Sequence, residues 1–275
     1  MVTRHSTNSN PALGGDCRVA LLESRELDER DYTCHLSIDE RTKYMALPNQ
    51  TRKNEWLAGR LAAKYIFLSR LEAPQVTHKK RWRPSLSKLT SDSFNLYPSW
   101  MYQQVEVATG GAKPSLVWCG QARPEGVSLS HSGGLSCVSV AFNAFTAIDI
   151  ENTAPRFAAF HRINFSNAER RWVNAAPSFR SDWFFTLLWT LKESVLKLGC
   201  FAQASIWNLP WIEIEGLPGV NDIEHFCFSS ALSNDFAVFN LTVKQHTCAI
   251  PVQVAVTGTR SLVLTVLNPL TGVIK

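Results

Sequence analysis

The chain has 275 residues, of which 45% are hydrophobic and 19% are charged, so it can bury a full core. Its length allows one large domain or two small ones, and its composition excludes disordered, collagen-like and coiled-coil proteins. Lys and Arg outnumber Asp and Glu by 28 to 23, a surplus that suits an anionic partner at a local patch but does not indicate nucleic-acid binding. Seven cysteines without a CxxC pair argue against a disulfide framework and a structural zinc site, and favour the reducing cytoplasm.

The first part of the chain predicts a helix-containing half that ends in strands. Residues 1–16 are polar and lack the apolar core of a secretory signal, and we interpret them as a disordered tail. Ser37 with Glu40 three residues later forms a capping box. A basic run followed by an aperiodic stretch predicts a loop or insertion over about 77–102. The remaining predicted elements are a strand at 18–23, a helix over 54–68, and strands at 116–118, 127–129 and 137–142.

The second part repeats this order of helices followed by strands. Ser166 and Glu169 form another capping box, and a long helix capped by Ser181 is expected to end at Leu198 before Gly199. The predicted strands are 146–151, 211–215, 225–229, 236–243 and 248–256. We therefore predict an α+β fold of two similar halves, 17–146 and 147–275. No apolar stretch approaches the about 20 residues that would span a bilayer.

Two acids in a predicted strand are the first candidates for chemistry. Asp149 and Glu151 are separated by one residue, so both side chains point to the same face of the strand. Two carboxylates held together repel unless a cation such as Mg²⁺ neutralises them. The alternative is a solvated strand face.

The long helix carries a third acid on the same side as a lysine. Trp189, Glu193 and Lys197 follow one another at spacings of four residues and share one helix face. This pattern is typical of a surface ion pair worth about 0.3–0.5 kcal/mol. Combined with the two strand acids, it also suits a metal-assisted transfer of a phosphoryl-type group.

Two further sites have both a functional and a structural interpretation. Ser130 and His131 precede Gly133 and Gly134, where a hydroxyl, an imidazole and backbone N–H groups can bind a phosphate, although such a pair is usually just part of a turn. Glu169 is either the capping-box residue of its helix or a base near the metal.

Three motifs, taken in order, resemble the 4'-phosphopantetheinyl transferases of the surfactin-synthetase-activating type. They are LSHS at 129–132, AIDIE at 147–151 and WTLKESVLKLG at 189–199. WLAGR at 56–60 and GAKP at 111–114 add to the resemblance, which covers roughly residues 18–199. The extra residue in GAKP, the length of 77–102 and the segment CFAQA at 200–204 depart from the family pattern.

The resemblance implies a monomer built as a pseudo-dimer of two α+β halves, with coenzyme A in the cleft between them. It implies transfer of phosphopantetheine to a serine of an acyl or peptidyl carrier protein, with secondary-metabolite carriers expected from the breadth of the family. The implied ligands of Mg²⁺, or of Mn²⁺, are Asp149, Glu151 and Glu193.

The resemblance also implies roles for the remaining candidates. Glu193, or as second choice Glu169, would act as the base. The implied coenzyme contacts are Lys197, Lys113, Ser130, His131, Arg41, Lys43 and Arg60.

Two other functions fit part of the pattern. A metal-dependent nuclease would also use clustered acids with a lysine, but it has no evident need for the SHS and GAKP segments. A coenzyme-binding or carrier-binding module without activity is the other alternative, and the presence of all three acids and Lys197 argues against it. We expect a cytoplasmic enzyme without a membrane segment and without a nucleic-acid partner.

Overall fold

The computed structural model describes residues 16–27, 32–72, 84–109, 113–142, 144–199, 201, 206–227, 236–259 and 262–269. The predicted tail, apart from Asp16, lies outside the described residues. The same holds for the basic run at 78–83, for Gly111 and Ala112, and for the CFAQA segment apart from Phe201.

A six-stranded sheet forms the first part of the fold, in the order β2-β1-β6-β5-β4-β3. Its strands are β1 (Asp16–Glu23), β2 (Ser85–Leu89), β3 (Val105–Ala108), β4 (Ser115–Trp118), β5 (Gln121–Ser132) and β6 (Leu135–Phe142). Strand β2 runs parallel to β1 and the other neighbours are antiparallel. The helices are α2 (Ile38–Met45), α3 (Gln50–Glu72) and α4 (Ser99–Gln104), with short 3-10 turns η1 (Ser24–Glu26), η2 (Thr33–His35) and η3 (Ser91–Leu96).

A five-stranded antiparallel sheet forms the second part, in the order β7-β11-β10-β9-β8. Its strands are β7 (Ala147–Asn152), β8 (Ile212–Glu215), β9 (Ala237–Gln245), β10 (Cys248–Thr259) and β11 (Leu262–Pro269). The helices are α5 (Ala158–Asn164), α6 (Asn167–Asn174), α7 (Ser181–Leu198) and α8 (Val220–Cys227), with 3-10 turns η4 (Ser178–Arg180) and η5 (Ile206–Trp211).

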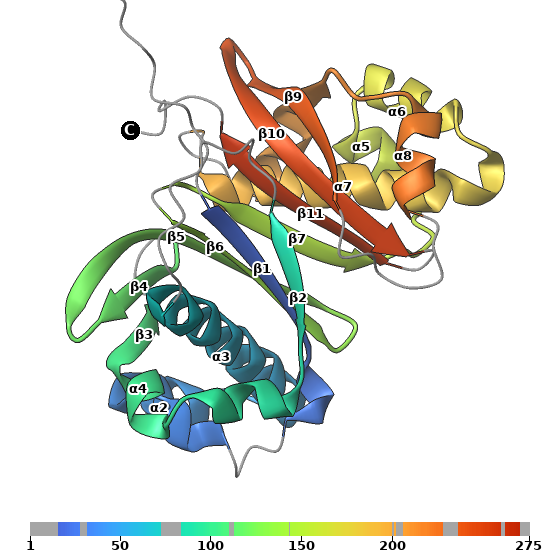
Figure 1. Cartoon of the computed structure of the whole chain (residues 1–275). Helices are drawn as coiled ribbons and strands as arrows, with labels where there is room; N and C mark the ends of the chain where they lie inside the picture. The colour runs from blue at the N-terminus through green and yellow to red at the C-terminus, as the bar shows by residue number, and fades with distance from the viewer. Residues whose placement is uncertain are drawn as a thin grey trace, which may run out of the picture.

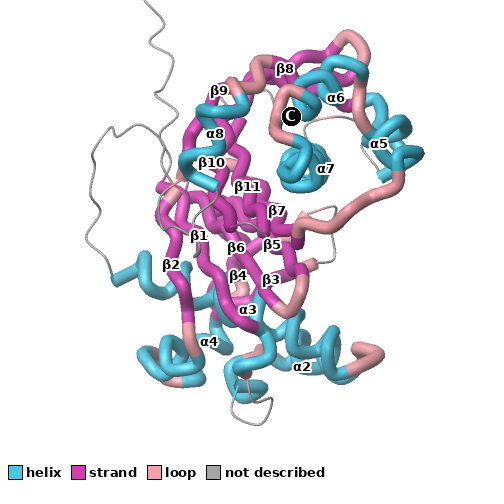
Figure 2. The backbone as a smooth tube through the Cα atoms, turned by 90° about the vertical axis from the view of Figure 1, so that its right-hand side faces the viewer, coloured by secondary structure: helices cyan, strands magenta, loops and turns pink. Residues whose placement is uncertain are grey.

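The two sheets lie against each other between two long helices, α3 and α7 (Figures 1 and 2). Alternate residues of β1 and β7, such as Val19 and Ile150, share a buried cluster between the sheets. The opposite face of the six-stranded sheet packs on α3, through residues such as Leu22 and Leu61. The opposite face of the five-stranded sheet packs on α7, through residues such as Leu188. Side-chain alternation along the strands thus builds three cores in one stack of layers.

A buried ion pair anchors the short helix α2. Ser37 and Glu40 form the predicted capping box, and both side chain and backbone take part. The Glu40 carboxylate also pairs with Lys64 of α3 and accepts a 2.9 Å hydrogen bond from the Val107 amide of β3. Lys64 in turn donates to the His35 carbonyl. One glutamate therefore ties a helix start, a long helix and a strand together.

The short helix α6 is anchored by the same set of contacts. Ser166 and Glu169 form the capping box, and Glu169 lies 2.9 Å from Lys192 of α7. Its other oxygen accepts a 3.0 Å hydrogen bond from the Ile214 amide of β8. Lys192 in turn donates to the Asn164 carbonyl. Each sheet thus has one short helix fixed by a buried glutamate to its long helix.

The structure confirms the α+β class and most of the predicted elements, with three corrections. For the described part of 77–102, the loop alternative is wrong, because β2, η3 and α4 form there, and the insertion alternative stays a prediction. The strand expected at 225–229 is wrong for residues 225–227, which belong to the helix α8, and residues 228–229 lie outside the described residues. Ser181 is the first residue of α7 and not its cap. Among the described helices, none is both long and apolar enough to cross a membrane.

Candidate functional site

Asp149 and Glu151 lie on β7, the edge strand of the five-stranded sheet. Their neighbours Ile148 and Ile150 fill the cluster between the sheets, so the two acids point to the other side, toward α7. Asp149 is buried, with 3% of its surface exposed, and Glu151 is half-buried. The predicted pair of acids on one face is therefore confirmed.

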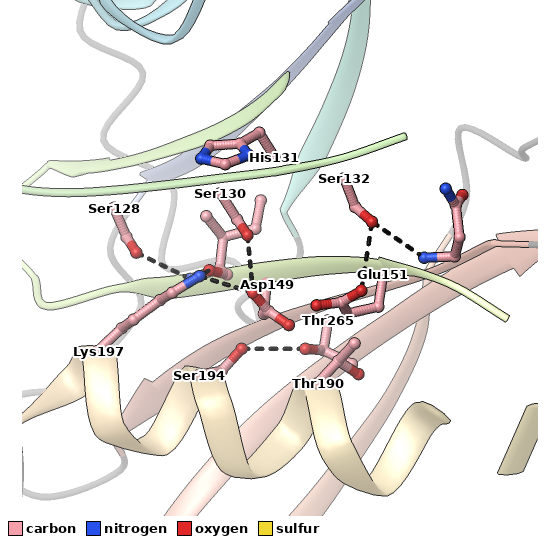
Figure 3. A network of polar contacts seen from close by, with 12 residues as sticks. Ser128, Ser130, His131, Ser132, Asp149, Glu151, Thr190, Ser194, Lys197 and Thr265 are labelled. Atoms are coloured by element: carbon pink, nitrogen blue, oxygen red, sulfur yellow. Dashed lines mark hydrogen bonds and ion pairs between the residues drawn. The ribbon is translucent and has the colours of Figure 1, made fainter. Parts of the chain in front are cut away.

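Helix α7 brings Lys197 and Glu193 to these acids. The Lys197 ammonium lies 2.6 Å from Asp149 Oδ1 and also donates to the Ile148 carbonyl at 3.2 Å (Figure 3). Glu193, one turn earlier, is half-buried and makes no hydrogen bond or ion pair within the described part of the chain. Lys197 therefore pairs with the strand acid, and not with Glu193 as a surface helix pair would.

The three carboxylates influence one another electrostatically. Burial raises the pKa of Glu193 above its ordinary value, Asp149 and Glu151 raise it further, and Lys197 opposes the rise. Burial likewise raises the pKa of Glu151, and the charge of Asp149 raises it further. The acids are therefore near enough to repel one another, and burial is the larger cause of both shifts.

This crowding suits a divalent cation. Asp149 Oδ2 is buried, and no described atom forms a hydrogen bond with it. Carboxylate oxygens are the ligands that Mg²⁺ prefers. As the side chains stand, no three His, Cys, Asp or Glu residues of the described chain are grouped closely enough to hold a metal ion. A cation held by all three carboxylates would therefore require at least one further side chain, such as Glu193, to turn toward Asp149, and binding would relieve the repulsion among the acids.

Three serines on alternate positions of β5 contact β7 (Figure 3). Ser130 donates to Asp149 Oδ1 at 2.7 Å, and Ser132 donates to Glu151 Oε2 at 3.2 Å. Ser128 accepts a 3.1 Å hydrogen bond from the Ile148 amide. Ser130 and Ser132 are thus strand residues and not turn residues, and the turn follows at the two glycines.

His131 points to the α3 side of the six-stranded sheet, where it meets the start of that helix. Its Nε2 contacts the guanidinium of Arg52, and its Nδ1 lies 3.3 Å from Glu55 Oε2. Because arginine only donates, Nε2 is the accepting nitrogen. Burial lowers the pKa of His131, and Glu55 opposes the change. The charges of Lys197 and Asp149 also act on this pKa, which places His131 within reach of the acid cluster.

The other basic candidates have different surroundings. Lys113 donates to the Leu198 carbonyl at the end of α7 and packs against Gly199. Arg60 is buried and stacks over Trp56, with 3.9 Å between its guanidinium carbon and the ring centre, and burial lowers its pKa to about 10.

The two basic residues of α2 are exposed. Lys43 lies 3.9 Å from Glu106, and Arg41 is open to solvent. The structure therefore joins His131 to Arg52, and the contacts that it shows for Arg41, Lys43 and Arg60 do not include His131 or Asp149.

The contacts of Glu169 do not include any of the three clustered acids. It is 1% exposed, and both oxygens are used, one by Ser166 and Lys192 and the other by the Ile214 amide. These contacts match the capping-box interpretation of the sequence.

Sequence reasoning missed Arg52, Glu55 and the contacts of Ser128 and Ser132. Arg52 and Glu55 form an i, i+3 pair in the first turn of α3. The sequence prediction began this helix at residue 54, four residues too late, and so left out Arg52. Opposite charges three residues apart stabilise a helix, and this signal could have extended the predicted helix to its true start. The alternation of Ser128, Ser130 and Ser132 was visible, but their partners lie on another strand.

Comparison with protein families gives a match over part of the chain. Residues 146–250 match the family model of the 4'-phosphopantetheinyl transferase superfamily, which supports a transferase role of this general kind. The matched segment contains Asp149, Glu151, Glu193 and Lys197, and it leaves out the serine strand β5. A search of curated proteins found no match.

Proposed function

We propose that this protein transfers the 4'-phosphopantetheine group of coenzyme A to a serine of an acyl or peptidyl carrier protein. The reaction would require Mg²⁺, with Mn²⁺ as a substitute, and would take place in the cytoplasm. The observation that carries the proposal is the buried Asp149 Oδ2, with which no described atom forms a hydrogen bond. The charges of Asp149, Glu151 and Lys197 act on the pKa of Glu193, and all four residues lie inside the segment that matches the superfamily.

The three acids would hold the cation together with the coenzyme's pyrophosphate. Bound there, Mg²⁺ would neutralise the charge that develops on the leaving phosphate. Lys197, now paired with Asp149, would exchange part of that contact for the pyrophosphate. Because lysine is a flexible point charge, this exchange needs only a rotation of its side chain.

Glu193 is the proposed base. The carrier serine attacks the β-phosphorus of coenzyme A, the new O–P bond forms as the bond to 3',5'-ADP breaks, and the serine proton passes to a Glu193 oxygen. In the metal-free protein, burial and neighbouring acids raise the pKa of Glu193. Glu169, with both oxygens engaged in structural contacts, stays outside this mechanism.

Arg52 and His131 are the proposed contacts for the phosphate at the adenosine end. They lie side by side on the α3 side of β5, and His131 is within electrostatic reach of Lys197. Ser130 could donate to a phosphate only after giving up its hydrogen bond to Asp149, whereas the Lys113 ammonium has further N–H donors beside the one on the Leu198 carbonyl. For Arg41, Lys43 and Arg60, a coenzyme contact stays a prediction.

A monomeric pseudo-dimer is the architecture we propose. The matching contact sets of Glu40 and Glu169 support it, since each connects a capped short helix, a lysine of the long helix and the edge strand of its sheet. Where the middle of β7 carries the two acids, however, the middle of its counterpart β1 has the apolar Ala20 and Leu22, which pack on α3. One chain would thus contain one catalytic site.

The test is transfer to an apo carrier protein, followed by intact mass. Coenzyme A, Mg²⁺ and the wild-type enzyme should add one phosphopantetheine, and Glu193→Gln should abolish the gain. The matched control is Glu215→Gln, since Glu215 lies on β8 at the opposite edge of the sheet and pairs with Lys244. Transfer by wild type and by the control, but not by Glu193→Gln, supports the proposal. Coenzyme A binding without transfer to any carrier would point to an inactive binding module.

A further inference from the structure

Two of the three serines of β5 donate to proposed cation ligands, and Ser132 is the one that contacts Glu151. It donates to Glu151 Oε2 at 3.2 Å and at the same time accepts a 3.3 Å hydrogen bond from the amide of Asn152 (Figure 3). Both partners are consecutive residues of β7. The backbone amide therefore fixes the hydroxyl oxygen, and its hydrogen is left to point at the carboxylate.

Glu151 depends on this contact more than Asp149 depends on Ser130. Asp149 is held by Ser130 and also by Lys197. Among the described residues, Ser132 is the one hydrogen-bond partner of the Glu151 carboxylate. A glutamate side chain has three rotatable bonds, so without this hydroxyl its carboxylate would be free to turn away from Asp149.

The tip of the β5–β6 hairpin sits close enough to β7 to keep Ser132 in place. At Gly133, which has a left-handed backbone with φ of +59°, an added Cβ would lie 2.0 Å from Asn152 Nδ2. Only glycine allows such a close approach without displacing a neighbour. The turn after Ser132 thus rests directly on the residue that follows Glu151.

We propose that Ser132 is a positioning residue that holds the Glu151 carboxylate ready to share a divalent cation with Asp149. The inference rests on the proposed function, because it takes the cation site as its premise. Hydrogen bonds to metal ligands from the surrounding shell commonly change metal affinity by 10- to 100-fold when removed.

Ser128 provides a matched control on the same strand. Its hydroxyl also contacts β7, but it accepts from the Ile148 amide and touches no carboxylate. Ser128→Ala therefore weakens the junction of the two sheets in the same way as Ser132→Ala, while the acids keep their partners. Ser132→Thr keeps a hydroxyl at the critical position and tests rescue.

The experiment is titration of Mn²⁺ into each metal-free protein, with the free ion followed by electron paramagnetic resonance. We expect Ser132→Ala to bind about 10-fold or more weakly than wild type. Ser132→Thr and Ser128→Ala should bind within about two-fold of wild type, by the same reasoning.

Two results would overturn the inference alone. One is a wild-type affinity in Ser132→Ala, and the other is an equal loss in Ser128→Ala, which would assign the effect to the junction of the strands. A wild-type protein that binds no Mn²⁺ would instead refute the cation site of the proposed function, and the role of Ser132 with it.

Discussion

Replacing Glu169 by glutamine separates its structural role from a catalytic one. The change leaves Lys192 as a buried charge without its partner, since the ammonium is fully enclosed and the ion pair is 2.9 Å long. Removing one member of a buried pair costs about 3–5 kcal/mol of folding free energy. The glutamine oxygen can still accept from the Ile214 amide, so the loss comes mainly from the charge.

This loss is large enough to measure by calorimetry. With about 2–4 °C per kcal/mol for a chain of this size class, the unfolding temperature should fall by about 6–20 °C. At a temperature well below the new transition, the transfer rate per folded molecule should stay near the wild-type value, because the glutamate contacts none of Asp149, Glu151 and Glu193.

Glu40→Gln is the matched control. Glu40 has the same capping box, buried lysine and strand amide, but it lies in the part of the fold that carries no acid cluster. The two variants should lose similar stability. If Glu169→Gln kept the wild-type unfolding temperature but lost transfer, while Glu40→Gln did not lose it, the structural interpretation would be wrong and Glu169 would return as a base.

Three further changes have definite expected outcomes. Because the fold raises the pKa of Glu193, its ionised form costs stability once the pH exceeds that pKa. In differential scanning fluorimetry at pH 7.5 without metal, Glu193→Gln should therefore be at least as stable as wild type. Added Mg²⁺ should raise the unfolding temperature of wild type but not that of Glu193→Gln. Burial lowers the pKa of His161 below 6.5, so the unfolded chain takes up the proton first and stability falls as the pH drops through that window. His161→Phe keeps the ring stacked 3.6 Å from Phe185 and should lose less stability between pH 7.5 and 5.5 in urea unfolding. Gly199→Ala should lower the free energy of unfolding for two reasons: it forces a left-handed backbone with φ of +59° on alanine, at about 1–2 kcal/mol, and it brings Cβ to 2.5 Å from Lys113 Cε. In a double-mutant cycle, Lys113→Ala should remove the loss that comes from this contact and leave the loss that comes from the backbone. An equal loss of stability with and without Lys113 would contradict the contact.

The features that the sequence predicted correctly are mainly local. Both capping boxes follow from a serine and a glutamate three residues apart, and the end of α7 follows from a glycine after an apolar helix. The shared face of Asp149 and Glu151 follows from strand alternation alone. Each of these patterns is complete within a few residues, so no knowledge of the fold is needed to interpret it.

The failures depend on partners that are distant in the sequence. SLSKL at 85–89 has too few apolar residues to suggest a strand, and it becomes β2 only by pairing in parallel with β1. The apolar residues near His225 resemble a strand but belong to α8, which has Asp222 in its first turn. Strand β11 was not among the strands predicted, although every residue of it is buried.

The site shows the same division. The types of its residues were predictable from spacing, but their partners were not. Ser130 donates to Asp149 and Arg52 contacts His131 because β5 crosses next to β7 and the start of α3. The sequence interpretation had assigned Ser130 to a phosphate and had not considered Arg52. Only the three-dimensional arrangement of the strands determines which hydroxyl and which guanidinium reach the same place.

The position of β7 has a consequence for biosynthesis. Its one backbone neighbour in the five-stranded sheet is β11, where Thr265 lies opposite Asp149 in the register. Among the strands of that sheet, β7 leaves the ribosome first and β11 last. The strand that carries the acids must therefore wait, with neither edge paired to a strand of its sheet, while α7 and three other strands are made. Contacts between such distant segments form late because closing the long loop between them costs entropy. A nascent chain that already contains every proposed catalytic residue would thus remain incompetent until β11 is available to complete the sheet.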